Sequence, residues 1–249
     1  MVDDIASVAE WLRSAQRVVV LTGAGISTDS GIPDFRGPNG VWTKDPQAEK
    51  MATLQHYLAD PEIRRRAWKS RLDHVAWTAE PNAGHRALVR LQDQDRLVAV
   101  ITQNVDELHQ KAGIDPDRVI EVHGTIRRYQ CLMCGDEGPM EFMLDRVRRG
   151  EDDPPCHICG GIVKSATISF GQPLVPDVID RALFVAGECD VFLAVGSTLQ
   201  VYPVAGAVPR AKAAGAVLVI VNAEPTAFDP VADAVLRGSI SEILPAVVG

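Results

Sequence analysis

The sequence predicts an α/β fold, in which a parallel β-sheet carries helices on both faces. The chain length suits one large domain, or one domain with a small insertion. The first observation is a set of short apolar runs rich in β-branched residues, as in strands that are buried on both faces. The second is that helical spacing fills the segments between these runs, as in strand–helix–strand crossovers. The third is composition, since 249 residues with 46% apolar and 23% charged side chains suffice for a sizeable core.

The individual elements follow from these patterns in chain order. Buried strands are predicted at 17–22, 97–102, 119–122, 191–195 and 217–221. Helices are predicted at 3–15, 46–78, 82–94 and 204–214. A loop rich in glycine and proline is predicted at 31–42. No internal repeat and no low-complexity linker interrupts this alternation of strands and helices.

Composition and charge argue against several classes of protein. The chain has 25 basic and 33 acidic residues, and this net charge of −8 disfavours direct binding to nucleic acid. The short basic clusters at 64–66 and 146–149 are expected on solvated helix faces. No uncharged apolar stretch reaches the ~18 residues of a membrane-spanning helix, and the N-terminus does not resemble a secretory signal. We therefore expect a cytoplasmic protein without membrane association.

Four of the five cysteines form two CxxC pairs, Cys131/Cys134 and Cys156/Cys159. Two such pairs at this separation suit one tetrahedral Zn²⁺ on four thiolates, with neighbouring glycines and prolines supplying the turns of a zinc ribbon. The alternatives are a redox pair or a chance arrangement. Four thiolates leave no open coordination position, so the predicted zinc is structural rather than catalytic. Cys189 is expected to be a buried free thiol.

Polar residues follow each predicted strand at its carboxyl end. In a parallel sheet these ends share one edge, where ligands bind. The residues concerned are Thr22–Gly25, Gln103–Asp106, His123, 196–198 and 222–224. The sequence therefore predicts a ligand site along this edge, with His123 as a candidate general base.

The stretch Gly23-Ala24-Gly25-Ile26-Ser27 joins the first strand to a predicted helix, and is typical of loops that approach a pyrophosphate. Thr28 stands where the dinucleotide fingerprint would have its third glycine, and the acidic residue that usually ends the second strand is missing. This argues against a hydride-transferring dehydrogenase. Glu224, after the last long strand, is the alternative partner for ribose hydroxyls. The loop around Asp34, Phe35 and Arg36 has the character of a lid over a ligand.

In this order, the segments GAGIS, GIPDFRG, TQNVDELHQKAG and EVHG and the two CxxC pairs resemble the sirtuin family of NAD-dependent protein lysine deacylases. The resemblance extends from about Arg17 to Leu244, and the GVWT turn that ends at Thr43 is similar to one prokaryotic branch. It implies a single catalytic core over 1–249. A Rossmann-like domain would comprise 1–126 and 167–249, with a helical module at about 38–78 and a zinc-binding insert at 127–166.

The resemblance also implies the roles of individual residues. His123 and Asn104 would be catalytic, and Asn104 and Asp106 would line the nicotinamide pocket. The implied NAD contacts are Gly23, Ala24, Gly25, Ser27, Asp34, Phe35, Arg36, Gln103, Asn104, Asp106, Gly196, Ser197, Asn222, Glu224 and the backbone near Ile240. The acyl-lysine oxygen would attack the ribose, expel nicotinamide and yield O-acyl-ADP-ribose.

The substrate of such an enzyme is an acylated lysine on a protein. Phe170, Val201 and Tyr202 would line its path, with Val201 and Tyr202 in a strand-like wall that pairs with an extended peptide. Arg71, in Trp68-x-x-Arg71, would bind the carboxylate of an acidic acyl chain, or would simply be an exposed helix arginine.

Two departures from the family pattern bear on these expectations. Ser197 and Thr198 exchange the usual order of their hydroxyl residues, and Gln172 replaces a glutamate that follows Phe170 and Gly171. Two alternatives to deacylation stay open, which are mono-ADP-ribosyl transfer to protein and a catalytically weak NAD sensor. The acyl preference and the oligomeric state are not indicated.

Overall fold

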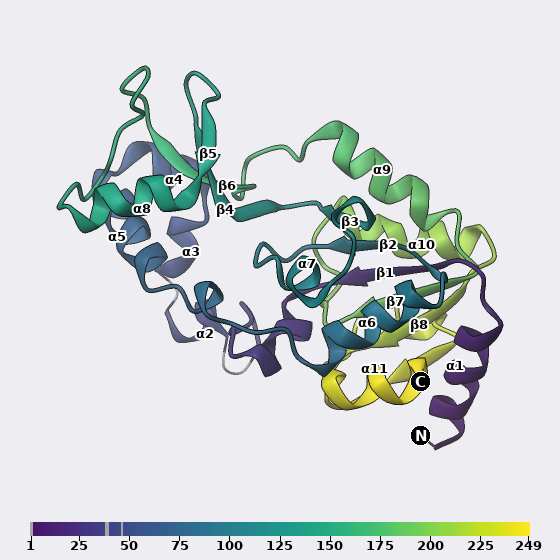
Figure 1. The fold of residues 1–249 in the computed structure, drawn as a ribbon. Helices are drawn as coiled ribbons and strands as arrows, with labels where there is room; N and C mark the ends of the chain where they lie inside the picture. Colours follow the sequence, from purple (N-terminus) through teal and green to yellow (C-terminus); the bar gives the residue numbers. More distant parts are fainter. Residues whose placement is uncertain (1, 38–39, 46) are drawn as a thin grey trace.

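The computed structural model describes residues 2–37, 40–45 and 47–249, and its largest element is a six-stranded sheet in which every pairing is parallel. The strand order is β3-β2-β1-β7-β8-β9 (Figure 1). The strands are β1 (Val18–Thr22), β2 (Leu97–Thr102), β3 (Val119–Glu121), β7 (Val191–Val195), β8 (Val217–Val221) and β9 (Ala234–Leu236). The predicted fold class is confirmed, and β2, β7 and β8 have the predicted bounds.

Helices cover both faces of this sheet (Figure 1). One face carries α1 (Val2–Ser14), α6 (Ala83–Asp93) and α11 (Ile240–Val248), and the other carries α9 (Pro176–Ala186) and α10 (Ala207–Ala213). Successive strand residues face opposite sides. In β1, Val18 and Val20 join the first core and Val19 and Leu21 join the second. Two buried faces therefore explain why the strands are continuously apolar.

Three of the strands and helices named so far, β9, α9 and α11, were not predicted from the sequence. β9 has only three residues, too few to show a period. α11 does have apolar residues at helical spacing on its buried face, but the sequence interpretation did not use this pattern, and Pro245 lies inside the helix. In contrast, α6 was predicted correctly because its apolar stripe is narrow and Asn82 caps its N-terminus.

Between β1 and β2 the chain forms a series of short helices. They are η1 (Ala24–Ser30), α2 (Val41–Lys44), α3 (Ala48–Met51), α4 (Leu54–Ala59), α5 (Pro61–Leu72) and η2 (Val75–Trp77). The helical region predicted at 46–78 is thus interrupted. One break has a clear cause, because the Asp60 side chain accepts a hydrogen bond from Glu62 N at 2.8 Å and Pro61 starts α5. Pro38, Asn39 and Pro46 lie outside the described residues.

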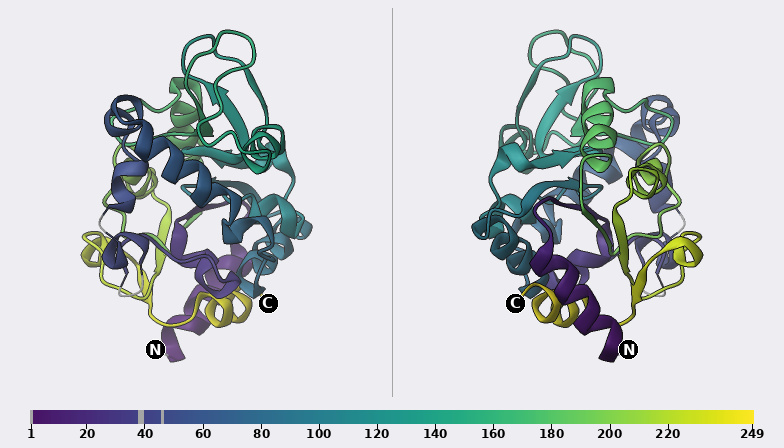
Figure 2. Two further views of the ribbon diagram at one scale, coloured as in Figure 1. Left: turned by 90° about the vertical axis from the view of Figure 1, so that its left-hand side faces the viewer. Right: turned by 90° about the vertical axis from the view of Figure 1, so that its right-hand side faces the viewer.

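A second, smaller sheet is antiparallel and has the order β5-β4-β6. It comprises β4 (Gly124–Cys131), β5 (Glu137–Pro139) and β6 (Val163–Thr167), with α8 (Met140–Arg148) packed against β4. Its loops project at the end of the molecule opposite the two termini (Figure 2). Its core cluster includes Trp68 of α5, so the cysteine-bearing insert and the helical module share one small core.

The remaining helical turns are short and lie in connections. They are α7 (Leu108–Ala112), η3 (Pro116–Arg118), η4 (Val204–Gly206) and η5 (Asp229–Val231). Within the part of the chain that the structure describes, no helix has both the length and the apolar character needed to cross a membrane.

Candidate active site and metal centre

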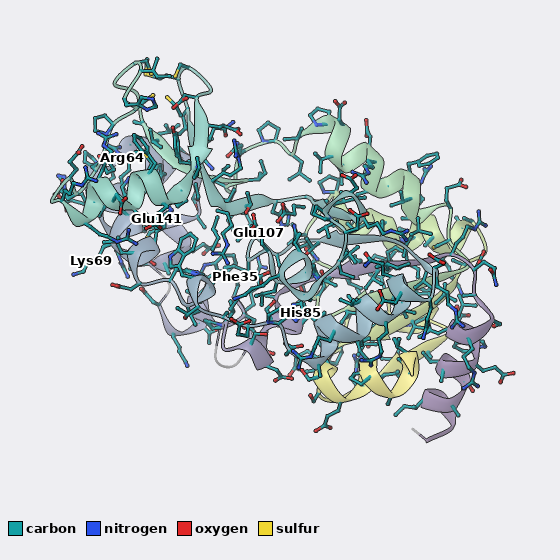
Figure 3. The ribbon with its side chains drawn as sticks, in the orientation of Figure 1. Phe35, Arg64, Lys69, His85, Glu107 and Glu141 are labelled. Carbon is teal, nitrogen blue, oxygen red and sulfur yellow. The ribbon has the colours of Figure 1, made fainter. Side chains whose placement is uncertain are left out.

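The four paired cysteines meet between the tips of two loops in the small sheet (Figure 3). All four sulfurs lie within 4.8 Å of one another. The Sγ atoms of Cys131 and Cys159 are 3.5 Å apart, and those of Cys134 and Cys156 are 3.7 Å apart. Zn–S bonds of ~2.3 Å in a tetrahedron require sulfurs separated by ~3.8 Å. The residues therefore fit a zinc ion with four thiolate ligands.

Cys189, in contrast, is buried away from this centre, and its thiol bonds to the Ala186 carbonyl at 3.4 Å. Burial raises its pKa to about 11. The predicted buried free thiol is confirmed, and a thiol in this state is a poor nucleophile.

The order of the large sheet reverses between β1 and β7, because the chain builds outward from β1 first on one side and then on the other. Ligands of such sheets bind in the crevice at this switch point. Here Gly23 and Gly25 meet Gly196, which has φ of +62°. A Cβ on either Gly23 or Gly25 would lie 2.7 Å from the Gly196 backbone. The glycines are thus required for contact between the two loops that border the crevice.

The predicted helix after Gly25 is a 3₁₀ helix, η1, rather than an α-helix. It has seven residues and ends at Gly31, which adopts a left-handed conformation with φ of 84°. A helix is therefore present at the predicted place, but it is of the 3₁₀ type. Ala24 is the first residue of η1, beside the switch point.

The side chains after β1, β2 and β7 bond directly to one another. Gln103 Nε2 donates to Ser197 Oγ at 2.8 Å. Asn104 Nδ2 donates to Gly23 O and Ser27 Oγ, both at 3.2 Å, and Ser27 Oγ donates to Asp106 Oδ2 at 2.8 Å. All of these except Gln103 are buried. The structure thus brings the predicted Gln103–Asp106 segment, the glycine loop and Ser197 into one polar cluster.

His123 lies in the turn between β3 and β4, where the large sheet meets the small one. Its Nδ1 is 3.1 Å from Gln103 O. Because a carbonyl oxygen only accepts, the neutral imidazole carries its proton on Nδ1 and keeps a lone pair on Nε2. Burial lowers the pKa of His123, and the hydrogen bond to Gln103 partly offsets this effect. An imidazole in this state can act as a base at neutral pH.

The loop after η1 folds onto an aromatic cluster. Asp34 Oδ1 accepts from Gly37 N at 2.8 Å, which closes a local turn. Phe35 packs against Trp42 with ring centroids 4.8 Å apart, and Trp42 packs against Phe170 at 5.4 Å. The Arg36 guanidinium lies 4.7 Å from the centre of the Trp42 ring. Phe35 and Phe170 are 44% and 39% exposed, so the two rings at the ends of this cluster remain accessible to a ligand.

The residues predicted after β8 lie at the edge of the crevice. Asn222 is buried and its Nδ2 donates to Glu224 O at 2.8 Å, whereas the Glu224 side chain is exposed. Ile240 is buried, and its side chain faces Gly84 of α6. Only the backbone of Ile240 is therefore a candidate for contact with a nucleotide.

The strand-like wall predicted at Val201 and Tyr202 is wrong. The segment that includes Pro203 forms a turn, and Ala205 N bonds to Val201 O at 2.9 Å. Tyr202 is 67% exposed. Strand-like pairing occurs instead at Phe170, which forms an isolated parallel bridge with Thr53 of the same chain.

Arg71 is not an exposed helix arginine, which was one of the two alternatives that the sequence left open. Its guanidinium lies 3.4 Å from Tyr57 Oη and 3.3 Å from Ser165 Oγ, above the ring of Trp68. Among the described residues, no carboxylate pairs with it in an ion pair. Lys164 is also buried nearby, and burial together with the Arg71 charge lowers its pKa to about 8. Two cationic side chains thus lie together, and no anionic partner for them occurs in the described part of the chain.

Sequence reasoning missed Lys164, Ser165 and Tyr57, because they come from segments far apart in the chain. It also missed Thr102 and His109, which form a buried polar chain with Thr22 under the Gln103–Asp106 segment. One signal was available, since Thr22 and Thr102 each end an otherwise apolar strand.

Comparison with known proteins agrees with this geometry. The model of the Sir2 family matches residues 23–203. An NAD-dependent protein deacetylase 2 from Streptomyces coelicolor is 53% identical over 231 residues, 93% of this chain and 96% of the relative. A solved structure from work on the mechanism and regulation of Sir2 enzymes is 40% identical to this chain, with a TM-score of 0.90. The match covers 100% of this chain and 97% of that one.

A second solved structure holds a Sir2 protein with a deacetylated peptide and 3′-O-acetyl ADP-ribose. It is 33% identical with a TM-score of 0.88, and the match covers 98% of this chain and 97% of that one. The family match spans more than half of the chain, and these likenesses extend over nearly all of it. This chain belongs to the Sir2 family.

Proposed function

We propose that this chain is an NAD-dependent protein lysine deacylase, which moves the acyl group of a modified lysine onto ADP-ribose and releases nicotinamide. The Streptomyces relative carries the name of such an enzyme, and the peptide complex contains the acetylated product. The observation that carries the proposal is the cluster at the switch point. There His123, with a free Nε2, is bonded to the same segment that holds the buried Asn104 and Asp106.

The proposed reaction has two parts, and both use groups along this edge of the sheet. The acyl oxygen attacks the anomeric carbon of the nicotinamide ribose as the bond to nicotinamide breaks. Asn104 and Asp106 line the nicotinamide pocket, where their amide and carboxylate suit a carboxamide. His123 Nε2 then takes the proton of a ribose hydroxyl, and that oxygen attacks the acyl carbon. Water completes the transfer, and the products are free lysine, nicotinamide and O-acyl-ADP-ribose.

The remaining proposed NAD contacts border the same crevice. The proposed contacts that flank the switch point are Gly23, Ala24, Gly25, Ser27, Gly196 and Ser197. Those that would cover it are Asp34, Phe35 and Arg36. Those farther along the crevice are Gln103, Asn222, Glu224 and the backbone of Ile240. NAD is consumed as a co-substrate. A zinc ion on the four cysteines would stabilise the small module, and it takes no part in the chemistry because its shell is closed.

We further propose that the acyl site accepts acidic acyl chains as well as acetyl. The support is the pair of cations, Arg71 and Lys164, that lies beside Tyr57 and Ser165 with no carboxylate partner in the described part of the chain. A succinyl or glutaryl carboxylate would supply the missing charge. Phe170 and Tyr202 are the proposed contacts with the rest of the acyl-lysine, with Val201 beside them. The proposed location is the cytoplasm, where thiols stay reduced.

Nicotinamide release from NAD tests the function, measured by mass spectrometry with and without peptides that carry acetyl- or succinyl-lysine. Peptide-dependent release of nicotinamide and loss of the acyl group are expected, with a strong decrease in the variant Asn104→Ala. Nicotinamide release that leaves ADP-ribose on protein would favour a transferase instead. NAD binding without release would favour a sensor. A matched Arg71→Met variant should lose succinyl removal but keep acetyl removal.

A further inference from the structure

Two buried histidines beneath the candidate site each have one ring nitrogen that finds no partner among the residues that the structure describes. They are His85 of α6 and His109 of α7 (Figure 3 labels the first). The ring centroids are 5.1 Å apart and the planes are tilted by 55°. The unpaired atoms are His85 Nε2 and His109 Nδ1. A buried polar atom without a partner is costly, so both nitrogens require an explanation.

The tautomer of His85 follows from its other nitrogen. His85 Nδ1 lies 3.4 Å from Asn82 N, whose hydrogen it accepts in the capping box of α6. Burial lowers the pKa of His85 to about 3, assisted by His109, so the ring is neutral. A neutral ring that accepts at Nδ1 carries its proton at Nε2. The unpaired atom of His85 is therefore a donor.

The tautomer of His109 follows in the same way. Its Nε2 is 2.9 Å from Thr22 Oγ1, and Thr22 donates its own hydroxyl hydrogen to Thr102 Oγ1 at 2.8 Å. His109 Nε2 must then donate to Thr22. Burial lowers the pKa of His109 to about 4, so this ring is neutral as well. Its Nδ1 carries no proton, and the unpaired atom of His109 is an acceptor.

The unpaired donor and the unpaired acceptor are complementary. These two atoms do not form a hydrogen bond with each other in the structure, and we propose that a small rotation of the rings lets His85 Nε2–H donate to His109 Nδ1. The two histidines then form a neutral relay that positions the Gln103–Asp106 segment. The opposite hydroxyl directions would put protons on both unpaired nitrogens, leaving two donors face to face. The charged groups that act on His85 are Asp106 and Arg86, which have opposite effects on its pKa.

The relay connects both sides of the candidate nicotinamide pocket. At one end, Asn82 Nδ2 donates to Ile26 O at 2.7 Å and to Ser30 Oγ at 3.0 Å, which secures η1. At the other end, Thr102 Oγ1 accepts from Asn104 N at 3.1 Å. Every bond between these ends has a fixed direction if the relay forms. His85 and His109 are thus positioning residues, which act on Asn104 through Thr22 and Thr102.

Nuclear magnetic resonance of the histidine side chains tests the relay in the free protein, without any need for activity. In protein labelled with ¹⁵N at the six histidines, both rings should be neutral Nε2–H tautomers at pH 7. The His85 Nε2 proton should show a coupling across a hydrogen bond to His109 Nδ1. Assignment comes from loss of each signal in the variants His85→Gln and His109→Gln. An Nδ1–H tautomer at either residue would overturn the proposal.

Kinetics supply the second test, and this part rests on the proposed deacylase function. A glutamine can donate and accept as the neutral histidine does, whereas leucine fills the space without hydrogen bonds. His109→Leu should decrease kcat for nicotinamide release by ~10–100-fold, the scale of a catalytic group that is misplaced by about 1 Å. His109→Gln should recover most of that loss at similar thermal stability. Equal losses in the two variants would reduce the role of His109 to packing and contradict the relay. Inactive wild-type protein with the expected tautomers would instead contradict the proposed function alone.

Discussion

The large parallel sheet and the small cysteine-bearing module are built on different physical principles. The sheet has two apolar cores, one on each face, and both consist mainly of aliphatic side chains from strands and covering helices. The core of the small module has eight buried side chains, and two of them are Cys131 and Cys156. The two cores of the sheet are thus built mainly from apolar side chains, whereas the core of the small module includes two candidate zinc ligands.

The two parts also contribute different residues to the candidate site. The polar groups of the candidate site come from loops that the rigid sheet positions, and they bond to one another at its switch point. The small module contributes Arg71, Lys164 and Phe170, which border the path of the acyl-lysine in the proposed function. A site of this kind requires both parts, so disrupting either one should abolish activity through a different physical event.

Removal of zinc should have the largest effect, because it removes the ligand that stabilises the small core. A chelator, or the variant Cys131→Ser, should abolish turnover. Hydrogen exchange should detect loss of protection in β4, β6 and α5, while β1 and β7 stay protected. A protein that keeps full protection and activity without metal would contradict the structural role of the zinc.

Replacement of the candidate base should have the next largest effect, and it should leave both parts folded. His123→Ala should decrease deacylation by ~10²–10⁴-fold, the usual contribution of a general base, while thermal stability and NAD binding change little. A decrease of less than tenfold would contradict the role of His123.

The pH dependence of the wild-type enzyme tests the same residue. Because burial lowers the pKa of His123, its neutral, basic form persists below the ordinary value of 6.5. Activity should therefore be full at pH 7 and should fall only as the pH decreases through that lowered pKa. A fall that is already complete above pH 6.5 would contradict this environment. The measurement is the initial rate across a pH series, with stability checked at each pH.

A cavity in the large sheet should lower stability and leave the metal centre intact. Leu193 of β7 is fully buried in the first core. Leu193→Ala should decrease the free energy of unfolding by ~2–5 kcal/mol. Chemical denaturation provides the free energy, and a colorimetric zinc assay provides the metal content. Loss of zinc at native conditions would mean that the two parts do not behave separately.

The smallest predicted effect concerns a link between the helical module and the insert. Arg64 Nε bonds to Asp153 Oδ2 at 2.8 Å, and these side chains are 12% and 23% exposed. Arg64→Ala should cost ~1–3 kcal/mol, since it leaves Asp153 without its partner. The control is Arg148→Ala, whose exposed side chain pairs with Glu141 and Asp145 within one helix, and which should cause no measurable change. Equal effects would contradict the burial of Arg64.

The two parts also differ in how far their structure was predictable from sequence. β7 and β8 were predicted with their observed bounds, because a strand buried on both faces is apolar at successive residues. The polar positions after those strands were predicted as well, since topology alone brings strand ends to one edge. Sequence patterns hold little information about long-range contacts. Arg64, expected on a solvated face, bonds to Asp153 across 89 positions of the chain.

The contacts of Arg71 and of the two histidines illustrate the same limit. Arg71 meets Ser165, 94 positions away, and no local pattern indicates that distance. His85 and His109 each lie on a helix, so their spacing suggests two ordinary core residues. Their proposed role follows only from the hydrogen-bond partners in the folded structure, which fix the tautomer of each ring. The strand-like wall at Val201 and Tyr202 was wrongly predicted, because it was inferred from the family resemblance and not from a strand pattern in these residues.

The most direct test of the central claim is the stoichiometry of the products. Nicotinamide, free lysine peptide and acyl-ADP-ribose should be quantified by mass spectrometry from NAD and an acetyl-lysine peptide in one reaction. The proposed function predicts equal amounts of the three, with the acetyl group on ADP-ribose. Deacetylated peptide accompanied by free acetate and intact NAD would contradict it.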